Sequence, residues 1–102
     1  MLYAIRYHPQ VTDDLRRLDK GVRDKVFKKI AQLAHAPESG NLLGNKAGLD
    51  LSGYRKLYAD NRRIRVVYRI EKETICVLIL AVGKRENLEI YRLARERLDN
   101  GI

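Results

Sequence analysis

The stretch that decides the fold is residues 53–91, GYRKLYADNRRIRVVYRIEKETICVLILAVGKRENLEIY. Residues 54–58 and 63–70 flank the turn 59–62 and predict two paired strands. A third run, residues 74–82, is apolar at nearly every position, which is typical of an internal strand covered on both faces. Gly83 permits a sharp turn over residues 83–86, and we expect a helix from residue 87 to about residue 99.

The N-terminal part of the chain is expected to pack on one face of this sheet. Residues 2–7 alternate and predict a short strand. Apolar residues then recur at helical spacing on either side of Gly21, which predicts a helical hairpin that ends before Pro37. Residues 38–52, rich in Gly, Ser and Asn, predict a loop. The expected fold is therefore α+β in the order β-α-α-β-β-β-α, with an antiparallel-rich sheet of about four strands.

Length and composition bound the class of protein. The 102 residues predict a single domain, residues 1–102. Lys and Arg number 21 against 13 Asp and Glu, so the net charge of +8 favours an anionic partner such as nucleic acid or an acidic protein. The longest apolar run, 75–82, is too short to span a bilayer, and the N-terminus lacks the apolar core of a signal peptide. We therefore expect a cytoplasmic protein without a membrane partner.

Neither a metal site nor a cofactor motif stands out. Cys76, the single cysteine, lies inside the apolar run and is expected to be a core residue. Gly40, Gly44 and Gly48 lack the Gly-Lys-Ser/Thr spacing of a phosphate-binding loop. The sequence predicts no metal and no cofactor.

Strand phase predicts which side chains share a surface. In 63–70 the arginines alternate with apolar residues, and in 54–58 Leu57 belongs with the apolar face. A hairpin that pairs Tyr58 with Arg63 would set Lys56 directly opposite Arg65. Like charges opposite one another destabilise a sheet, which favours an anion site, although a solvated face with splayed side chains is the alternative. The side chains predicted to share the basic face are Tyr54, Lys56, Tyr58, Arg63, Arg65 and Arg69.

This basic face carries aromatic rings among its charges. Basic residues interleaved with aromatics are typical of surfaces that bind single-stranded nucleic acid, because phosphates take the charge and bases stack. Arg85 directly follows Lys84, just past the end of the apolar run 74–82, and is expected to approach this face from a third segment of the chain. Tyr91, further along the helix, either approaches the same surface or belongs to the core. Arg55 points, by phase, to the opposite face.

Three motifs resemble a known family. Tyr54-Arg55-Lys56-Leu57, Arg65-Val66-Val67-Tyr68 and Val82-Gly83-Lys84-Arg85-Glu86, with Tyr91 five residues later, are similar to the RelE branch of the RelE/ParE toxin superfamily. The order of the elements also resembles that family. The resemblance implies a metal-independent mRNA endonuclease that acts in the ribosomal A site. It also implies inhibition by a cognate acidic antitoxin within a toxin–antitoxin hetero-oligomer.

The resemblance also implies the catalytic residues Lys56, Arg65, Arg85 and Tyr91. Cleavage by the 2′-hydroxyl needs a base, charge stabilisation at phosphorus and a proton for the leaving oxygen. Lys56 would be the base, because neighbouring arginines disfavour its protonated form. Arg65 and Arg85 would clamp the phosphate, and Tyr91 would stack on or orient the scissile nucleotide. The additional RNA-binding residues are predicted to be Tyr54, Arg55, Tyr58, Arg63 and Lys84.

Alternatives stay open at this point. Either Lys56 or Arg55 takes the basic-strand role of the family. A ParE-like toxin would inhibit DNA gyrase without cutting nucleic acid. An inactive relative would bind only RNA or an antitoxin.

Overall fold

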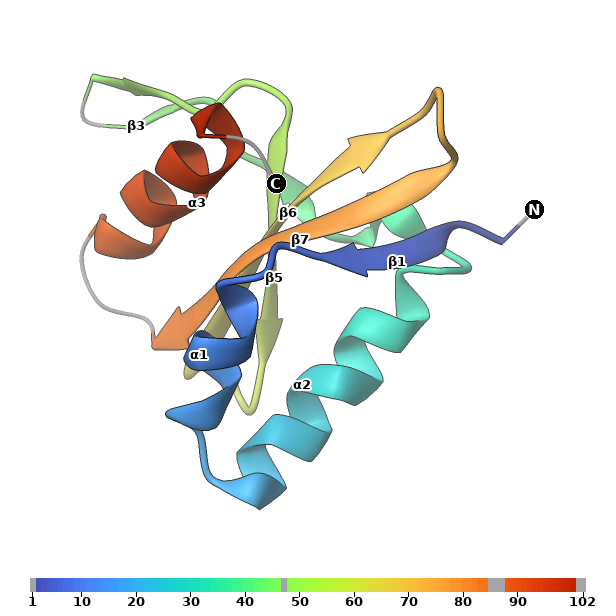
Figure 1. The fold of residues 1–102 in the computed structure, drawn as a ribbon, viewed down its shortest axis with the longest axis vertical. Coiled ribbons are helices and arrows are strands. Elements are labelled where there is room, and N and C mark those ends of the chain that lie inside the picture. Colours follow the sequence, from blue (N-terminus) through green and yellow to red (C-terminus); the bar gives the residue numbers. More distant parts are fainter. Residues whose placement is uncertain (1, 47, 85–87, 101–102) are drawn as a thin grey trace.

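A mixed five-stranded sheet forms the centre of the computed structural model, which describes residues 2–46, 48–84 and 88–100. β1 pairs with β7 in parallel, and the other neighbouring strands are antiparallel (Figure 1). The α+β prediction is confirmed, with one more strand in the sheet than expected. In spatial order the strands are β1 Ala4–Tyr7, β7 Cys76–Lys84, β6 Ile64–Glu71, β5 Tyr54–Ala59 and β2 Asn41–Leu42.

Helices cover both faces of the sheet. α1 (Val11–Arg16) and α2 (Lys20–Gln32) pack on one face, over Val66, Val77 and Ile79 among others. α3 (Glu89–Asp99) packs on the other face, over Val67, Leu78 and Leu80 (Figure 1). Among the described residues, no helix combines the length and the apolar character needed to cross a membrane.

The segment between α2 and β5 is more ordered than the predicted loop. A 3₁₀ turn (Pro37–Ser39) leads into β2, and β3 (Asn45–Lys46) and β4 (Leu49–Asp50) form a small separate hairpin. The buried hydroxyl of Tyr68 fixes the start of this segment, since it accepts a hydrogen bond from Gly40 N–H at 2.9 Å and donates one to the Pro37 carbonyl at 2.7 Å. A Cβ at Gly40 would lie 2.5 Å from that hydroxyl, so only glycine fits here.

β7 is buried over seven consecutive residues, Cys76 to Val82, which confirms the prediction of an internal strand covered on both faces. Pairing with β6 slips by one residue between Val67 and Tyr68, so β7 carries a β-bulge at Leu80. Leu80 and Ala81 therefore both face α3, and Val82 faces α1 and α2.

Gly83 has a different role from the predicted sharp turn. It lies within β7, where an added Cβ would meet Ile90 Cδ1 at 3.0 Å. The missing side chain thus lets the start of α3 pack closely against the end of the strand.

The β5–β6 hairpin keeps the predicted faces but not the predicted register. Ala59 pairs with Ile64, and both are buried against the helical hairpin layer. The turn between them contains three consecutive residues with positive φ: Asp60 (51°), Asn61 (53°) and Arg62 (68°). Asp and Asn tolerate this left-handed conformation better than most residues. The register that results sets Arg65 opposite Tyr58 and Lys56 opposite Val67, so the predicted Lys56–Arg65 pairing is wrong.

Candidate functional site: a basic and aromatic cluster

Tyr58 lies at the centre of the candidate site. Lys56, two residues earlier on β5, donates a hydrogen bond from Nζ to the Tyr58 hydroxyl at 3.0 Å. Arg65 is directly opposite on β6, and its guanidinium carbon lies 5.8 Å from the centre of the Tyr58 ring. Arg62, from the hairpin turn, approaches the same ring to 5.8 Å. The structure therefore brings Lys56, Tyr58 and Arg65 together as predicted, with Arg62 as an addition.

Tyr91 supplies a second ring to Arg65. The guanidinium carbon of Arg65 lies 5.1 Å from the centre of the Tyr91 ring. Tyr91 is only 1% exposed and belongs to the core beneath α3. Tyr91 was expected either to approach the basic face or to belong to the core. It does both, because it is a core residue whose ring contacts Arg65 on the basic face.

The charges of this cluster are not neutralised within the described part of the chain. Neither Lys56 nor Arg65 forms an ion pair with a described carboxylate, and the buried Nε of Arg65 has no hydrogen-bond partner among the described residues. Cation–π contacts hold a guanidinium in place without cancelling its charge. We refer to Lys56, Tyr58, Arg62, Arg65 and Tyr91 as the Tyr58 cluster.

Tyr54 and Arg69 form a separate pair on the same face. Arg69 lies opposite Tyr54 in the β5–β6 ladder, with its guanidinium carbon 5.1 Å from the ring centre. Burial raises the pKa of the Tyr54 phenol, and the charge of Arg69 opposes that shift. With an exposed fraction of 4% and a cation over its ring, Tyr54 is a core residue and does not offer an open face to a base.

Arg55 and Lys84 lie away from the predicted basic face. Arg55 pairs with Tyr68 on the α1–α2 side and donates hydrogen bonds to the carbonyl oxygens of Gly40 (2.8 Å) and Glu38 (3.3 Å). It therefore anchors the segment before β2, and Lys56 is the basic residue of β5 that faces the cluster. Lys84 pairs with Ile64, whose side chain belongs to the core under α1 and α2.

Arg63 belongs to the hairpin turn and is exposed. With Lys84 it lines a groove of about 610 Å³ between that turn and the α1–α2 connection. Among the described residues, Arg62 is the one that both the groove and the Tyr58 cluster contain. The structure thus separates the predicted RNA-binding residues. Tyr58 lies in the Tyr58 cluster, Arg63 and Lys84 line the groove, and Tyr54 and Arg55 belong to neither.

Arg85 lies outside the described residues. The strand before it, β7, ends at Lys84, and Gly83 in that strand pairs with Arg65. The predicted catalytic role of Arg85 stays a prediction.

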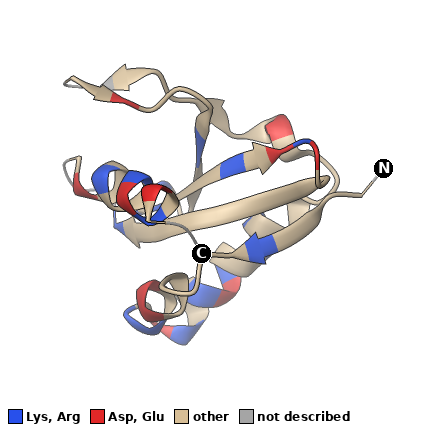
Figure 2. Cartoon of the chain, turned by 45° about the horizontal axis from the view of Figure 1, so that its top comes forward, with Lys and Arg blue, Asp and Glu red and all other residues tan. Residues whose placement is uncertain are grey.

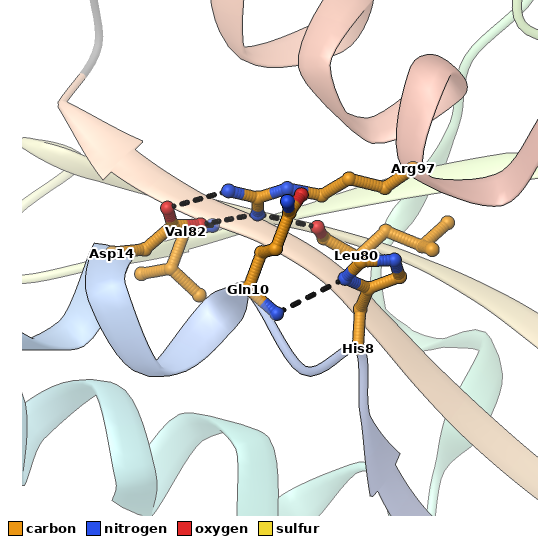
Figure 3. A network of polar contacts seen from close by, with 6 residues as sticks. All are labelled: His8, Gln10, Asp14, Leu80, Val82 and Arg97. Atoms are coloured by element: carbon orange, nitrogen blue, oxygen red, sulfur yellow. Dashed lines mark hydrogen bonds and ion pairs between the residues drawn. The ribbon is translucent and has the colours of Figure 1, made fainter. Parts of the chain in front are cut away.

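A buried ion pair was missed by the sequence interpretation. Arg97 on α3 binds both carboxylate oxygens of Asp14 on α1, at 2.7 and 2.9 Å (Figure 3). A signal was present, since Asp14 lies three residues after the buried Val11 on α1, and Arg97 lies three residues after the buried Ala94 on α3. Charged residues on apolar stripes are expected to be paired.

Comparisons with known proteins identify the family of this chain. The family model for the ParE toxin of the type II toxin–antitoxin system parDE matches residues 5–89. The chain belongs to the RelE/ParE toxin family. The mRNA interferase toxin RelE of Escherichia coli (strain K12) is 30% identical over 104 residues, covering 96% of this chain and 99% of that protein.

Solved structures confirm the resemblance to the RelE branch. A mutant of E. coli toxin RelE in the free state matches with a TM-score of 0.78 and 26% identity, covering 96% of this chain and 99% of that chain. The toxin–antitoxin complex RelBE2 from Mycobacterium tuberculosis matches with a TM-score of 0.70 and 26% identity, covering 83% of this chain and 100% of that chain.

Proposed function

We propose that this member of the family is the toxin of a type II toxin–antitoxin system and cleaves mRNA in the ribosomal A site. The observation that carries the proposal is the Tyr58 cluster, in which Lys56 and Arg65 meet around one tyrosine without a described carboxylate to neutralise them. The E. coli relative, similar over nearly its whole length, is named an mRNA interferase. A ribosomal substrate places the activity in the cytoplasm.

The proposed reaction uses the RNA, the protein side chains and one proton from solvent. Lys56 takes the proton of the 2′-hydroxyl while the 2′-oxygen attacks the adjacent phosphorus. Arg65 binds the charge that grows on the non-bridging oxygens, with Arg85 beside the leaving oxygen. The P–O5′ bond breaks, a proton from solvent completes the 5′-hydroxyl, and a 2′,3′-cyclic phosphate remains.

Tyr91 has a role that differs from the stacking expected at first. Its ring is buried under the guanidinium of Arg65, so the ring is covered on the side that faces the cluster. We assign Tyr91 to orienting Arg65, which makes it a positioning residue rather than a base-stacking one. Tyr58 is half-buried, whereas Tyr54 and Tyr91 are buried, so we assign the aromatic contact with RNA to Tyr58.

An acidic antitoxin is the proposed protein partner. The net charge of the chain is +8, and Figure 2 shows Lys and Arg on the sheet and on all three helices. Such a surface favours a negatively charged segment that folds over it. The M. tuberculosis neighbour was solved as a toxin–antitoxin complex, which supports a hetero-oligomer here as well.

Gyrase inhibition is the second candidate, because the family model that matches residues 5–89 describes ParE toxins. Primer extension on a reporter mRNA after induced expression separates the two. Cuts at defined positions within codons support cleavage, and uncut mRNA with inhibited DNA supercoiling supports the second candidate. Growth without either effect, together with retained RNA or antitoxin binding, indicates an inactive relative.

A further inference from the structure

Asp14 and Arg97 join three elements at one edge of the sheet. Their side chains are 3% and 7% exposed, and the guanidinium binds the carboxylate through two nitrogens. Arg97 Nη1 also donates to the Leu80 carbonyl at 2.9 Å, and Asp14 Oδ2 accepts from Val82 N–H at 3.0 Å. Figure 3 shows the pair lying across β7, between α1 and α3.

The backbone of β7 explains why charged groups are buried here. β1 ends at Tyr7, and His8 N–H makes the next bond, to the Ile79 carbonyl. The Leu80 carbonyl and the Val82 N–H come directly afterwards, at the β-bulge, and are bonded to side chains instead of a strand. Unpaired buried backbone groups are rare because they are costly. The carbonyl needs a donor and the N–H needs an acceptor, so the arginine and the aspartate cannot exchange places.

The same pair fixes where α3 lies. The helix has 11 residues and no side-chain cap at its N-terminus, so packing decides its position. Ile90, Tyr91 and Ala94 supply apolar contacts, which are non-directional and tolerate sliding or rotation. A two-nitrogen contact to a carboxylate is directional. Arg97 therefore sets the rotation and the axial position of the helix that carries Tyr91.

We propose that Asp14 and Arg97 are positioning residues that hold Tyr91 against Arg65 and so set the rate of RNA cleavage. The chain of contacts runs from α1 through the ion pair to α3, and from Tyr91 to the guanidinium 5.1 Å away. This inference rests on the proposed function for its effect on rate. Its effect on the Tyr91 ring can be measured without any activity.

A double-mutant cycle tests the effect on rate. Asp14→Asn keeps the shape of the side chain but removes the charge and half of the contact to Arg97. We expect Asp14→Asn to lower kcat by about tenfold and to change KM by less than about twofold. When Tyr91→Leu is already present, we expect Asp14→Asn to lower kcat by less than about twofold, because the effects of residues that act as one unit are not additive. An equal loss in both backgrounds would overturn the inference.

The control lies on the same helix. Asp99 forms an exposed pair with Arg95 at 3.9 Å, so Asp99→Asn changes a charge of α3 without touching β7. We expect it to leave kcat unchanged. Arg97→Lys is the second variant, for use if circular dichroism shows that Asp14→Asn is unfolded, since it retains the charge and loses the two-nitrogen geometry.

Fluorine NMR supplies the readout that does not depend on activity. In protein labelled with 3-fluorotyrosine, the resonance absent from Tyr91→Leu belongs to Tyr91. We expect that resonance to shift or split in Asp14→Asn and to stay in place in Asp99→Asn. A moved resonance in a protein that cleaves no RNA would support the positioning role and reject the proposed function. An unmoved resonance in folded Asp14→Asn would reject the positioning role itself.

Discussion

Two arginines of this protein, Arg65 and Arg97, are held in opposite ways. Arg97 is buried, binds a carboxylate through two nitrogens and donates to a backbone carbonyl. Arg65 is held between the rings of Tyr58 and Tyr91 and forms no ion pair with a described carboxylate. The first charge is cancelled within the protein, and the second stays available to an anion. The comparison shows that holding a side chain in place does not require neutralising its charge, since Arg65 is held by two rings and keeps its charge available to an anion.

Arg97→Met is expected to have the largest effect, on stability. It leaves the Asp14 carboxylate buried without its partner, and breaking such a pair costs about 3–5 kcal/mol. Urea denaturation followed by circular dichroism measures the change. Arg95→Met, on the exposed part of the same helix, is the control and should change the free energy of unfolding by less than about 0.5 kcal/mol. A loss below about 1 kcal/mol for Arg97→Met would contradict the assignment of this pair as a structural anchor.

Arg65→Met is expected to show the reverse pattern. Removing one group that stabilises charge in a transition state typically costs about 2.7–4 kcal/mol of the barrier, which corresponds to a 10²–10³-fold fall in kcat. Stability should fall by only about 1–2 kcal/mol, since two cation–π contacts are lost. Cleavage of a reporter mRNA on purified ribosomes, paired with urea denaturation, tests both parts. Full activity in a folded Arg65→Met protein would remove Arg65 from the site.

Tyr58→Phe separates the ring of Tyr58 from its hydroxyl. The ring contact to Arg65 is retained, and the hydrogen bond to Lys56 at 3.0 Å is lost. A hydrogen bond contributes about 0.5–1.5 kcal/mol, so we expect cleavage to slow by roughly 2- to 10-fold with little change in stability. Tyr54→Phe is the matched control, because Tyr54 contacts Arg69 and not Lys56. Equal effects from the two variants would show that the hydroxyl of Tyr58 has no special role.

The salt dependence of RNA binding gives the smallest effect and the most direct comparison. A protein that neutralises one more phosphate of single-stranded RNA steepens the slope of log K against log salt by about 0.7. Arg65→Met should therefore flatten the slope by about that amount. Arg97→Met should leave the slope unchanged at a temperature where the variant is folded, because its charge is already paired. Filter binding across a salt series measures both slopes.

The sequence predicted the faces of the sheet better than the pairing between strands. Alternation places Leu57 and Val66 on one face and Lys56 and Arg65 on the other, as the structure has them. Alternation is unchanged when a hairpin shifts by two residues, so it could not distinguish Tyr58–Arg63 from Tyr58–Arg65. The left-handed turn and the burial of Ala59 decide between them, and both depend on the whole fold.

The site was predictable where it lies within regular strands. Lys56, Tyr58 and Arg65 follow from phase alone. Arg62 does not, because a residue with positive φ in a turn obeys no alternation. Strands β2, β3 and β4 have two residues each, which is too short for an alternation of polar and apolar residues to be recognised in the sequence. The partnership of Asp14 with Arg97 spans 83 positions of the chain, a separation at which local pattern gives no information.

Leu80 is the extra residue of the bulge in β7, and it shifts the alternation of side chains between the two faces by one position. Upstream of it, odd-numbered residues face α1 and α2, and downstream of it even-numbered residues do. Deleting one residue there would restore regular alternation after Ile79, so Val82 would still face α1 and α2 and Gly83 would still lie against Ile90. The deletion would instead remove the bulge, and with it the local backbone course that presents the Leu80 carbonyl to Arg97 and the Val82 N–H to Asp14.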